Sequence, residues 1–292
     1  MAHPPIVDRI RAAALHDRAL LPVHAHFGVR AVAAEIGQVE VAQAMGSYCL
    51  DPHGRLSPGA FLVGADAALG AAVASQLPDQ LSVISLTLRM EFIRLQPAAA
   101  EDFLIRGRVA HIGDHSGFAH GEVVSDVGDV IAFLSTHCAF APNHAAAPAG
   151  PGFPIDRSLR SLAAHGDDVL GPLATVRAGA RLVDGNDGEV RLVASPTAEM
   201  SNSRGDVQGG VLGMLAEQAV TACLIRNTPA VAGADAMELN VTYVRPLRSE
   251  QPDIKVVARP EHASRRFASA HAVGYDSSGR VLITASGSRY RG

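Results

Sequence analysis

The hydrophobic pattern of the chain is clearest at 202–223, where a polar loop ends in two glycines and leads into an apolar segment. No proline occurs in this segment, and its apolar residues recur with helical spacing at Val211, Met214, Leu215, Ala219 and Ala222. The pattern predicts a helix with one buried face. Glu217 lies on or beside that face, with Thr221 one turn further along. A carboxylate in such a position is costly unless it is paired or used in chemistry.

Two glycines stand directly before this helix. Gly209 and Gly210 have no side chains, so a ligand oxygen can come close to their backbone N–H groups. Those groups lie at the positive end of the helix dipole, which favours negative charge. The pattern therefore indicates an oxyanion hole.

The chain repeats itself at an offset of about 151 residues. Asp66 aligns with Glu217 within two apolar helical segments, and the strand-like segment around Phe92 aligns with the one around Tyr243. In each copy we expect a short N-terminal helix, a hairpin, a glycine-marked helix and then three strands joined by tight turns. The repeat therefore covers nearly the whole chain.

The repeat predicts two α+β domains, at 1–140 and 153–292, joined by a linker at 141–152 that is rich in Ala, Pro and Gly. Related copies pack together as the subunits of a homodimer do. We therefore expect a pseudo-dimer whose two antiparallel sheets face or continue each other, with the functional site between the copies.

Composition excludes several classes of protein. The formal net charge of −4 and the lack of a Lys/Arg run argue against nucleic-acid binding. No apolar stretch is long enough to span a membrane, and the N-terminal sequence has no secretion signal, so neither a membrane partner nor export is expected. An odd number of widely spaced cysteines favours the cytoplasm. Metal-ligand spacings and nucleotide-binding motifs are absent, so we expect no metal and no cofactor.

Three spaced motifs in the second copy carry a family resemblance. Asn202 stands six residues before the sequence Gln-Gly-Gly, Glu217 follows the second glycine by seven residues, and a later strand ends in Tyr-Val-Arg-Pro. Together they resemble the hotdog-fold acyl-CoA thioesterases, in particular the PaaI-like and 4-hydroxybenzoyl-CoA types. The resemblance spans 181–290 and is fainter in the first copy.

The resemblance implies a fold and a set of roles. Each hotdog has a long helix wrapped by an antiparallel sheet, and two hotdogs build each active site at their interface. The resemblance implies that Asn202 and the N–H of Gly209 polarise the thioester carbonyl, that Glu217 is the acid and that Thr221 assists it. Gln208 and Gly210 would belong to the same substrate-binding loop.

The first copy departs from this pattern. Asp51 replaces Asn202 and Gly70 replaces Thr221, whereas Asp66 and Gly59 keep the acid and the second glycine. Pro58 replaces Gly209, and proline has no N–H to donate. A carboxylate at Asp51 would also repel a developing oxyanion.

The resemblance implies that the acid usually comes from the other hotdog, and with that arrangement the departures predict one competent site rather than two. It would combine Asp66 of the first copy with Asn202, Gln208 and Gly209 of the second. Glu217 is the second choice for the acid, in case the site is built within one copy. We expect Asp66→Asn to remove most activity and Glu217→Gln to be milder.

The predicted function is hydrolysis of an acyl-CoA thioester by a homodimer of pseudo-dimers. Whether the carboxylate activates water or attacks the thioester directly stays open. Two other functions also stay open: an acyl-CoA binder without catalysis, and a hydratase or dehydratase, which would need a histidine near the acid. The structural alternative for both acids is neutralisation by an arginine such as Arg89 or Arg245.

Overall fold

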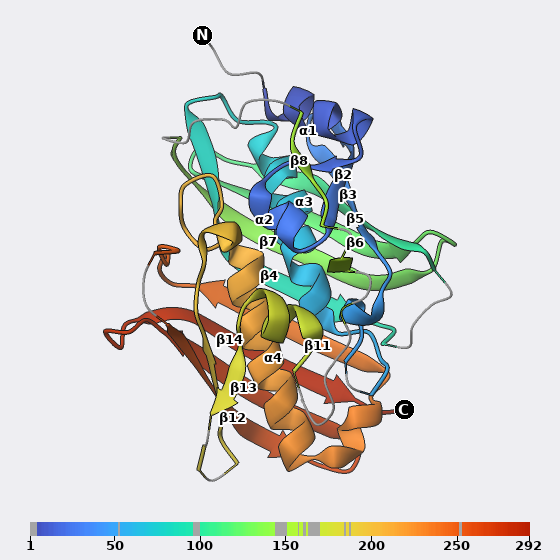
Figure 1. The fold of residues 1–292 in the computed structure, drawn as a ribbon, viewed down its shortest axis with the longest axis vertical. Helices are drawn as coiled ribbons and strands as arrows, with labels where there is room; N and C mark the ends of the chain where they lie inside the picture. Colours follow the sequence, from blue (N-terminus) through green and yellow to red (C-terminus); the bar gives the residue numbers. More distant parts are fainter. Residues whose placement is uncertain are drawn as a thin grey trace.

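One continuous antiparallel sheet runs through the whole molecule, with two central helices packed against it (Figure 1). The computed structural model describes residues 5–51, 53–95, 100–143, 151–156, 158–159, 162, 170–183, 185–186, 188–250 and 253–292. Within these ranges the sheet has 12 strands. The buried apolar residues of both copies form one hydrophobic core.

The first copy contains the elements expected from its hydrophobic pattern. In chain order they are α1 (Ile6–Leu15), α2 (Pro22–His26), β2 (Val29–Glu35), β3 (Gln38–Ala44), α3 (Leu62–Ala74), β4 (Leu81–Phe92), β5 (Asp102–Ile112), β6 (Ser116–Ser125) and β7 (Val130–Pro142). Short 3-10 turns at Ser47–Cys49 and Pro58–Phe61 lead into α3.

The second copy repeats this order. Its elements are a π-helical turn at Leu173–Arg177, β9 (Arg181–Val183), β10 (Val190–Ala194), α4 (Gly209–Asn227), β11 (Ala236–Tyr243), β12 (Ile254–Ala263), β13 (Phe267–Tyr275) and β14 (Val281–Tyr290), with 3-10 turns at Ala198–Met200 and Pro229–Gly233. The residues that correspond to α1 lie partly outside the described residues.

The strand order has the same internal pattern in both halves. It reads β2-β3-β5-β6-β7-β4 and then β11-β14-β13-β12-β10-β9, so the repeat is reversed about the seam between β4 and β11. At the seam Leu88 pairs with Val241 and Met90 with Leu239. The prediction of two α+β copies whose sheets continue each other is confirmed.

Two details of the prediction were wrong. Four strands, not three, follow each central helix, because β5 and β12 were missed. In β5 the alternation is weakened by Gly107 between two arginines, and in β12 a register shift follows Pro260. In addition, α4 is buried on all sides from Gly210 to Leu224 rather than on one face. A helix that is enclosed by a sheet and a second helix has no polar face to show.

The two central helices touch where α4 begins. A Cβ on Gly210 would lie 2.3 Å from the carbonyl oxygen of Leu62 and 2.5 Å from the Cα of Val63. Only glycine allows this approach of α4 to the first turn of α3. The N-terminus of α4 is thereby fixed against the other copy.

The expected linker lies mostly outside the described residues, at 144–150. Its first two residues, Ala141 and Pro142, belong to β7. After it, β8 (Phe153–Pro154) pairs with β1 (Arg18–Ala19), which precedes α2. The chain therefore pairs with the first copy once more before it forms the strands of the second copy.

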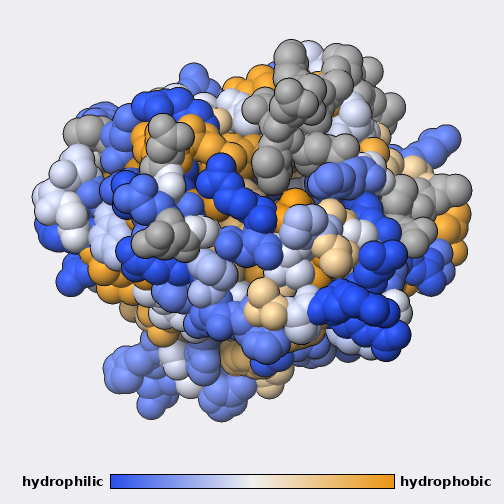
Figure 2. Space-filling view, turned by 90° about the horizontal axis from the view of Figure 1, so that it is seen from below, coloured by the Kyte–Doolittle hydropathy of each residue, from blue (hydrophilic) through white to orange (hydrophobic). Residues whose placement is uncertain are grey.

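No described helix is long and apolar enough to cross a membrane. Seen from the end occupied by the second copy, the surface is mostly hydrophilic, and hydrophobic residues show in small separate groups (Figure 2).

Replacing Gly210 by alanine tests the helix contact. We expect Gly210→Ala to lower the free energy of unfolding by about 1–3 kcal/mol, because the new methyl group must push α4 away from α3. Urea unfolding followed by circular dichroism measures the change. Gly70→Ala is the matched control, since a Cβ there meets nothing closer than a Val83 methyl at 3.7 Å. Equal stability of the Gly210→Ala variant and the wild type would contradict the argument.

Candidate active site

The two acids occupy equivalent positions, each facing the helix N-terminus of the other copy. The Gly210 N–H donates to Oδ2 of Asp66 over 3.2 Å, and the Gly59 N–H donates to Oε2 of Glu217 over the same distance. Asp66 therefore lies with the loop of the second copy, and Glu217 with the loop of the first.

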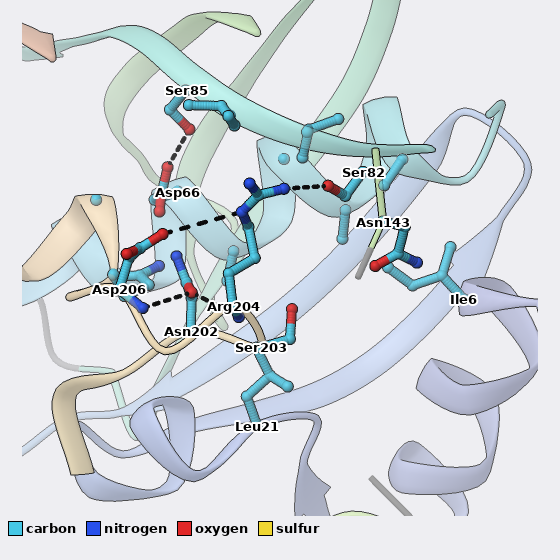
Figure 3. A pocket seen from close by; sticks show the side chains of 18 of the residues that line it. Ile6, Leu21, Asp66, Ser82, Ser85, Asn143, Asn202, Ser203, Arg204 and Asp206 are labelled. Carbon is cyan, nitrogen blue, oxygen red and sulfur yellow. Dashed lines mark hydrogen bonds and ion pairs between the residues drawn. The ribbon is translucent and has the colours of Figure 1, made fainter. Parts of the chain in front are cut away.

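Asp66 stands on the second turn of α3 at the edge of a pocket. Its Oδ1 accepts a hydrogen bond from the Ser85 hydroxyl over 2.6 Å (Figure 3). Its Oδ2 accepts from the Gly210 N–H. The side chain is partly exposed to the pocket. Burial raises the pKa of Asp66, and the hydrogen bonds from Ser85 and Gly210 oppose that rise. A carboxylate in this setting is a stronger base than an ordinary aspartate.

The loop before α4 holds its own side chains in place. Oδ1 of Asn202 accepts from the N–H groups of Arg204 at 2.8 Å and Asp206 at 3.3 Å, so the amide NH2 is the group left to donate to a ligand. Figure 3 places Asn202 on the same side of the pocket as Asp66. Gln208 is 4% exposed, caps α4 through the N–H of Val211 and donates to the carbonyl of Val63. Its amide is thus used to join the copies.

Gly209 combines a held carbonyl with an N–H that can reach a ligand. The Tyr243 hydroxyl donates to the Gly209 carbonyl over 2.9 Å. Among the described residues, the Gly209 N–H has no acceptor. Burial, with the charge of Asp66 as a smaller cause, raises the pKa of Tyr243, so this hydroxyl keeps its proton. The Gly209 peptide is therefore oriented before any ligand arrives.

The pocket at Asp66 has a volume of about 620 Å³ and lies between the copies. One wall is α3, where Gly70, Ala71 and Ala74 leave room beside β4. The loop of the second copy and the end of β11 form the opposite wall, with Asn202, Gln208, Gly209 and Tyr243. Asp66 and three of the predicted loop residues thus share one cavity.

Glu217 is enclosed instead. It is 0% exposed and does not line this pocket. Its Oε1 accepts from the Thr221 hydroxyl at 2.6 Å, and Oε2 accepts from Nε2 of Gln218 at 2.6 Å as well as from Gly59. Burial raises its pKa most, while Thr221, Arg289 and Gln218 lower it. Every described contact of this carboxylate is internal to the protein.

A buried arginine occupies the space beside Glu217. Arg289 of β14 is 1% exposed, its Nη2 lies 3.4 Å from the Thr221 hydroxyl, and its Nη1 lies 3.9 Å from Oδ2 of Asp51. Asp51 holds its own loop through Oδ1, which accepts from the N–H groups of His53 and Arg55. The second acid thus sits in a charge-compensated core.

The structure separates the predicted residues into two groups. Asp66, Asn202, Gln208 and Gly209 line the pocket; the remaining five, Asp51, Gly59, Gly210, Glu217 and Thr221, do not. Burial keeps the second group away from the pocket, and the N–H groups of Gly59 and Gly210 are already used, because they donate to the two acids. That these five residues bind or act on a substrate therefore stays a prediction, since none of them lines this pocket.

Sequence reasoning missed three residues that shape the sites: Ser85, Tyr243 and Arg289. Neither arginine proposed as a neutralising partner does that work, because Arg89 pairs with Glu91 and Glu238, and Arg245 donates to the carbonyl of Val281. The signal for Arg289 was available: at the offset of 151 it aligns with Cys138, an uncharged residue in an inward position. The described residues hold no cluster suited to a metal ion.

The comparisons with known proteins agree with this geometry. A family model described as Thioesterase superfamily matches twice, at residues 53–132 and 204–283, which together are more than half of the chain. The chain therefore belongs to the thioesterase superfamily, and it carries two copies of the family's hotdog domain. A sequence comparison with curated proteins finds no match.

Several solved structures share the two-domain fold. Acyl-CoA thioesterase II TesB2 from Mycobacterium marinum has a TM-score of 0.61 at 11% identity, over 92% of this chain and 98% of its own. The tesB protein of Mycobacterium avium subs paratuberculosis has a TM-score of 0.61 at 12% identity, over 93% and 99%. A hot dog fold protein of unknown function from Alicyclobacillus acidocaldarius has 0.58 at 13%, over 92% and 97%. At these identities the likeness concerns the fold.

Removal of Arg289 tests the compensated core. We expect Arg289→Met to lower the free energy of unfolding by about 3 kcal/mol or more, because Glu217 and Asp51 lose their buried counter-charge. Chemical denaturation measures the loss. The double variant Arg289→Met/Glu217→Gln should lose less than the sum of the two single changes, since each removes part of the same interaction. Additive losses would contradict the coupling.

Proposed function

We propose that this protein hydrolyses acyl-CoA thioesters at the pocket of Asp66. The observation that carries the proposal is the meeting, in one open cavity, of a desolvated carboxylate and an oriented N–H at the start of α4. Membership of the thioesterase superfamily supports the same chemistry. An acyl-CoA substrate is proposed because the motifs resemble those of acyl-CoA thioesterases and because the M. marinum protein, which has the same fold, is named an acyl-CoA thioesterase.

The parts suggest one course for the reaction. The thioester oxygen would accept hydrogen bonds from the Gly209 N–H and the Asn202 amide, which stabilise the negative charge that develops there. Asp66 would take a proton from a water molecule as the water oxygen bonds to the carbonyl carbon. When the carbon–sulfur bond breaks, the thiolate leaves and Asp66 returns the proton to it. Direct attack by Asp66 to give a mixed anhydride is the alternative course.

The proposal assigns activity to one of the two equivalent sites. Glu217 is a poor candidate for the acid because its oxygens are satisfied internally and its side chain is fully buried and does not line the pocket. Pro58, which has no N–H, stands where the Gly209 donor is needed in that copy.

The hydratase or dehydratase alternative requires a histidine that acts with the acid. Among the described residues no histidine is hydrogen-bonded to Asp66; its partners are Ser85 and Gly210. His24 lines the same pocket but has no bond to the carboxylate. The geometry therefore favours hydrolysis.

We also propose the cytoplasm as the compartment and a homodimer of pseudo-dimers as the assembly. All three cysteines are free and buried, as suits a reducing environment. The PaaI-like subtype inferred from the motifs is part of the proposal, while the solved structures above share the TesB-like double-hotdog fold over the whole chain.

Paired neutral substitutions test the assignment of the acid. We expect Asp66→Asn to reduce kcat by roughly 10²- to 10⁴-fold, because the base is lost. Stability should change little, since an asparagine can accept from Gly210 and donate to the Ser85 hydroxyl. Glu217→Gln should keep turnover but lose about 1–3 kcal/mol of stability, because the buried guanidinium of Arg289 would lose one of the two negative charges that face it.

Free-thiol release from phenylacetyl-, benzoyl-, acetyl-, hexanoyl- and palmitoyl-CoA measures the activity of both variants, and urea unfolding measures their stability. Loss of turnover in the Glu217→Gln variant alone would move the acid to the other site. Thermal stabilisation by an acyl-CoA without any thiol release would leave a binding protein instead of an enzyme.

The pH dependence provides an independent test. The reaction needs the ionised form of Asp66, whose pKa burial raises above its ordinary value of 3.8. We therefore expect kcat/KM to rise with pH through that elevated pKa and then to level off. Initial rates between about pH 4 and about pH 8 give the profile, and Glu217→Gln should leave its midpoint in place. A rate that is flat down to the ordinary aspartate pKa would contradict a desolvated base.

A further inference from the structure

An arginine without a partner lines the pocket on its α1 side. The guanidinium of Arg9 has no hydrogen bond or ion pair with any described residue, although the residue is only partly exposed and burial lowers its pKa. On the same helix Arg11 bonds to the carbonyl of Ala34 at 2.9 Å and lies 3.8 Å from Asp8. A guanidinium carries five donors, and holding it partly out of water without an acceptor is costly.

A histidine without a partner lines the same pocket. His24 of α2 is 6% exposed, and neither of its ring nitrogens is bonded to a described residue. Burial lowers its pKa to about 4, so the ring is neutral at neutral pH and offers one donor and one acceptor. Buried polar groups are normally paired, so a ring that lines a cavity without a protein partner is available to bind a polar ligand.

These two side chains belong to one corner of the molecule. A small cavity beside the pocket is lined by Ile10, next to Arg9 in sequence, and by His24, and it shares Leu20, Ala67 and Ala71 with the pocket. Figure 3 shows Ile6 of α1 across the pocket from Asp66, with Ser82 of β4 between them. Arg9 follows Ile6 by one helical turn. The corner is therefore reached from the acid along the pocket.

The wall that connects Asp66 with this corner suits a hydrocarbon chain. From Asp66 to Gly70 and Ala71, α3 advances by roughly 6–8 Å at 1.5 Å per residue, which is about the length of an extended six-carbon acyl chain. Gly70, Ala71 and Ala74 leave space along it, and Leu20 and Leu21 line the pocket from the α2 side. Arg204 and Arg245 line the pocket with the loop of the second copy and the end of β11. The same cavity thus offers an apolar wall beside Asp66 and the unpaired guanidinium of Arg9.

We propose that the acyl group taken by this site ends in a carboxylate, which Arg9 and His24 bind, so that the substrate is the CoA thioester of a dicarboxylic acid. A carboxylate accepts two parallel hydrogen bonds from a guanidinium and a further one from a neutral imidazole N–H. This inference rests on the proposed function, because the thioester must sit at Asp66. A phosphate of CoA has the same anionic chemistry and is the other source that the experiment must separate.

The experiment compares matched acyl groups. Adipoyl-CoA and hexanoyl-CoA have the same chain length and differ only in the terminal carboxylate. For the wild type we expect adipoyl-CoA to have the higher kcat/KM. Arg9→Met should lower the adipoyl-to-hexanoyl ratio by about ten- to hundredfold, Arg9→Lys should restore part of it, and His24→Gln should lower it less than Arg9→Met. Arg11→Met removes a charge from the same helix outside the pocket and should leave the ratio unchanged.

The same acyl groups on N-acetylcysteamine, which has no phosphates, separate the two sources. If the ratio changes in the same way with these thioesters, the carboxylate is the group that Arg9 binds. If Arg9→Met weakens both CoA substrates equally and leaves the N-acetylcysteamine thioesters untouched, Arg9 binds a phosphate of CoA and the proposal is overturned. An unchanged ratio in Arg9→Met overturns it too.

Binding of free acids gives a readout that does not depend on hydrolysis. Adipate should raise the melting temperature of the wild type more than hexanoate does, and Arg9→Met should abolish the difference. No thiol release from any substrate, combined with this adipate effect, would reject the proposed hydrolysis but keep the carboxylate site. Thiol release without any preference for the carboxylate would do the reverse.

Discussion

Where α4 begins against α3, Gly210 brings its N–H to within 3.2 Å of the Asp66 carboxylate, and no side chain fits between the two helices. This contact joins the copies at the point where the chemistry is proposed. The dipole of α4 favours a negative charge there, while enclosure of the carboxylate opposes it. The position of the loop before α4 and the shape of the pocket depend on this crossing, because α3 and α4 carry the residues that form them.

The same crossing exists twice, yet its surroundings differ in charge and space. Beside Glu217, β14 supplies Arg289 and α4 supplies Thr221, and both fill the volume next to the acid. At the equivalent positions near Asp66 the chain has Cys138 and Gly70, which are smaller and uncharged. A cation beside a carboxylate lowers its basicity and a bulky neighbour excludes substrate. The two sites therefore differ in charge and space mainly because Arg289 and Thr221 stand where the other site has Cys138 and Gly70. The difference between Glu217 and Asp66 matters less.

Much of the fold and of the candidate site could be predicted from the sequence, because the repeat shows each element and each candidate residue twice. The offset of 151 aligned Asp66 with Glu217, and the family resemblance implied that each acid faces the loop of the other copy. In the structure Asp66 accepts a hydrogen bond from Gly210 of that loop. The sequence could not show that α4 is enclosed on all sides, since an apolar stripe and full burial differ only in what packs around the helix. Nor could it reveal that the Gln208 side chain joins the two copies, because its partner Val63 is set by the crossing itself.

The closed site also explains why the acid stands where it does. Asp51 and Asn202 fold their loops in the same way, each accepting from the N–H groups two and four residues further on. The hydrogen bond from helix N-terminus to acid is likewise kept at Glu217, which is fully buried and does not line the pocket. Loop and hydrogen bond are therefore part of the packing between the copies. A reactive carboxylate is distinguished by an oxygen that still has a free acceptor position facing a pocket. Water or a substrate can then reach that oxygen.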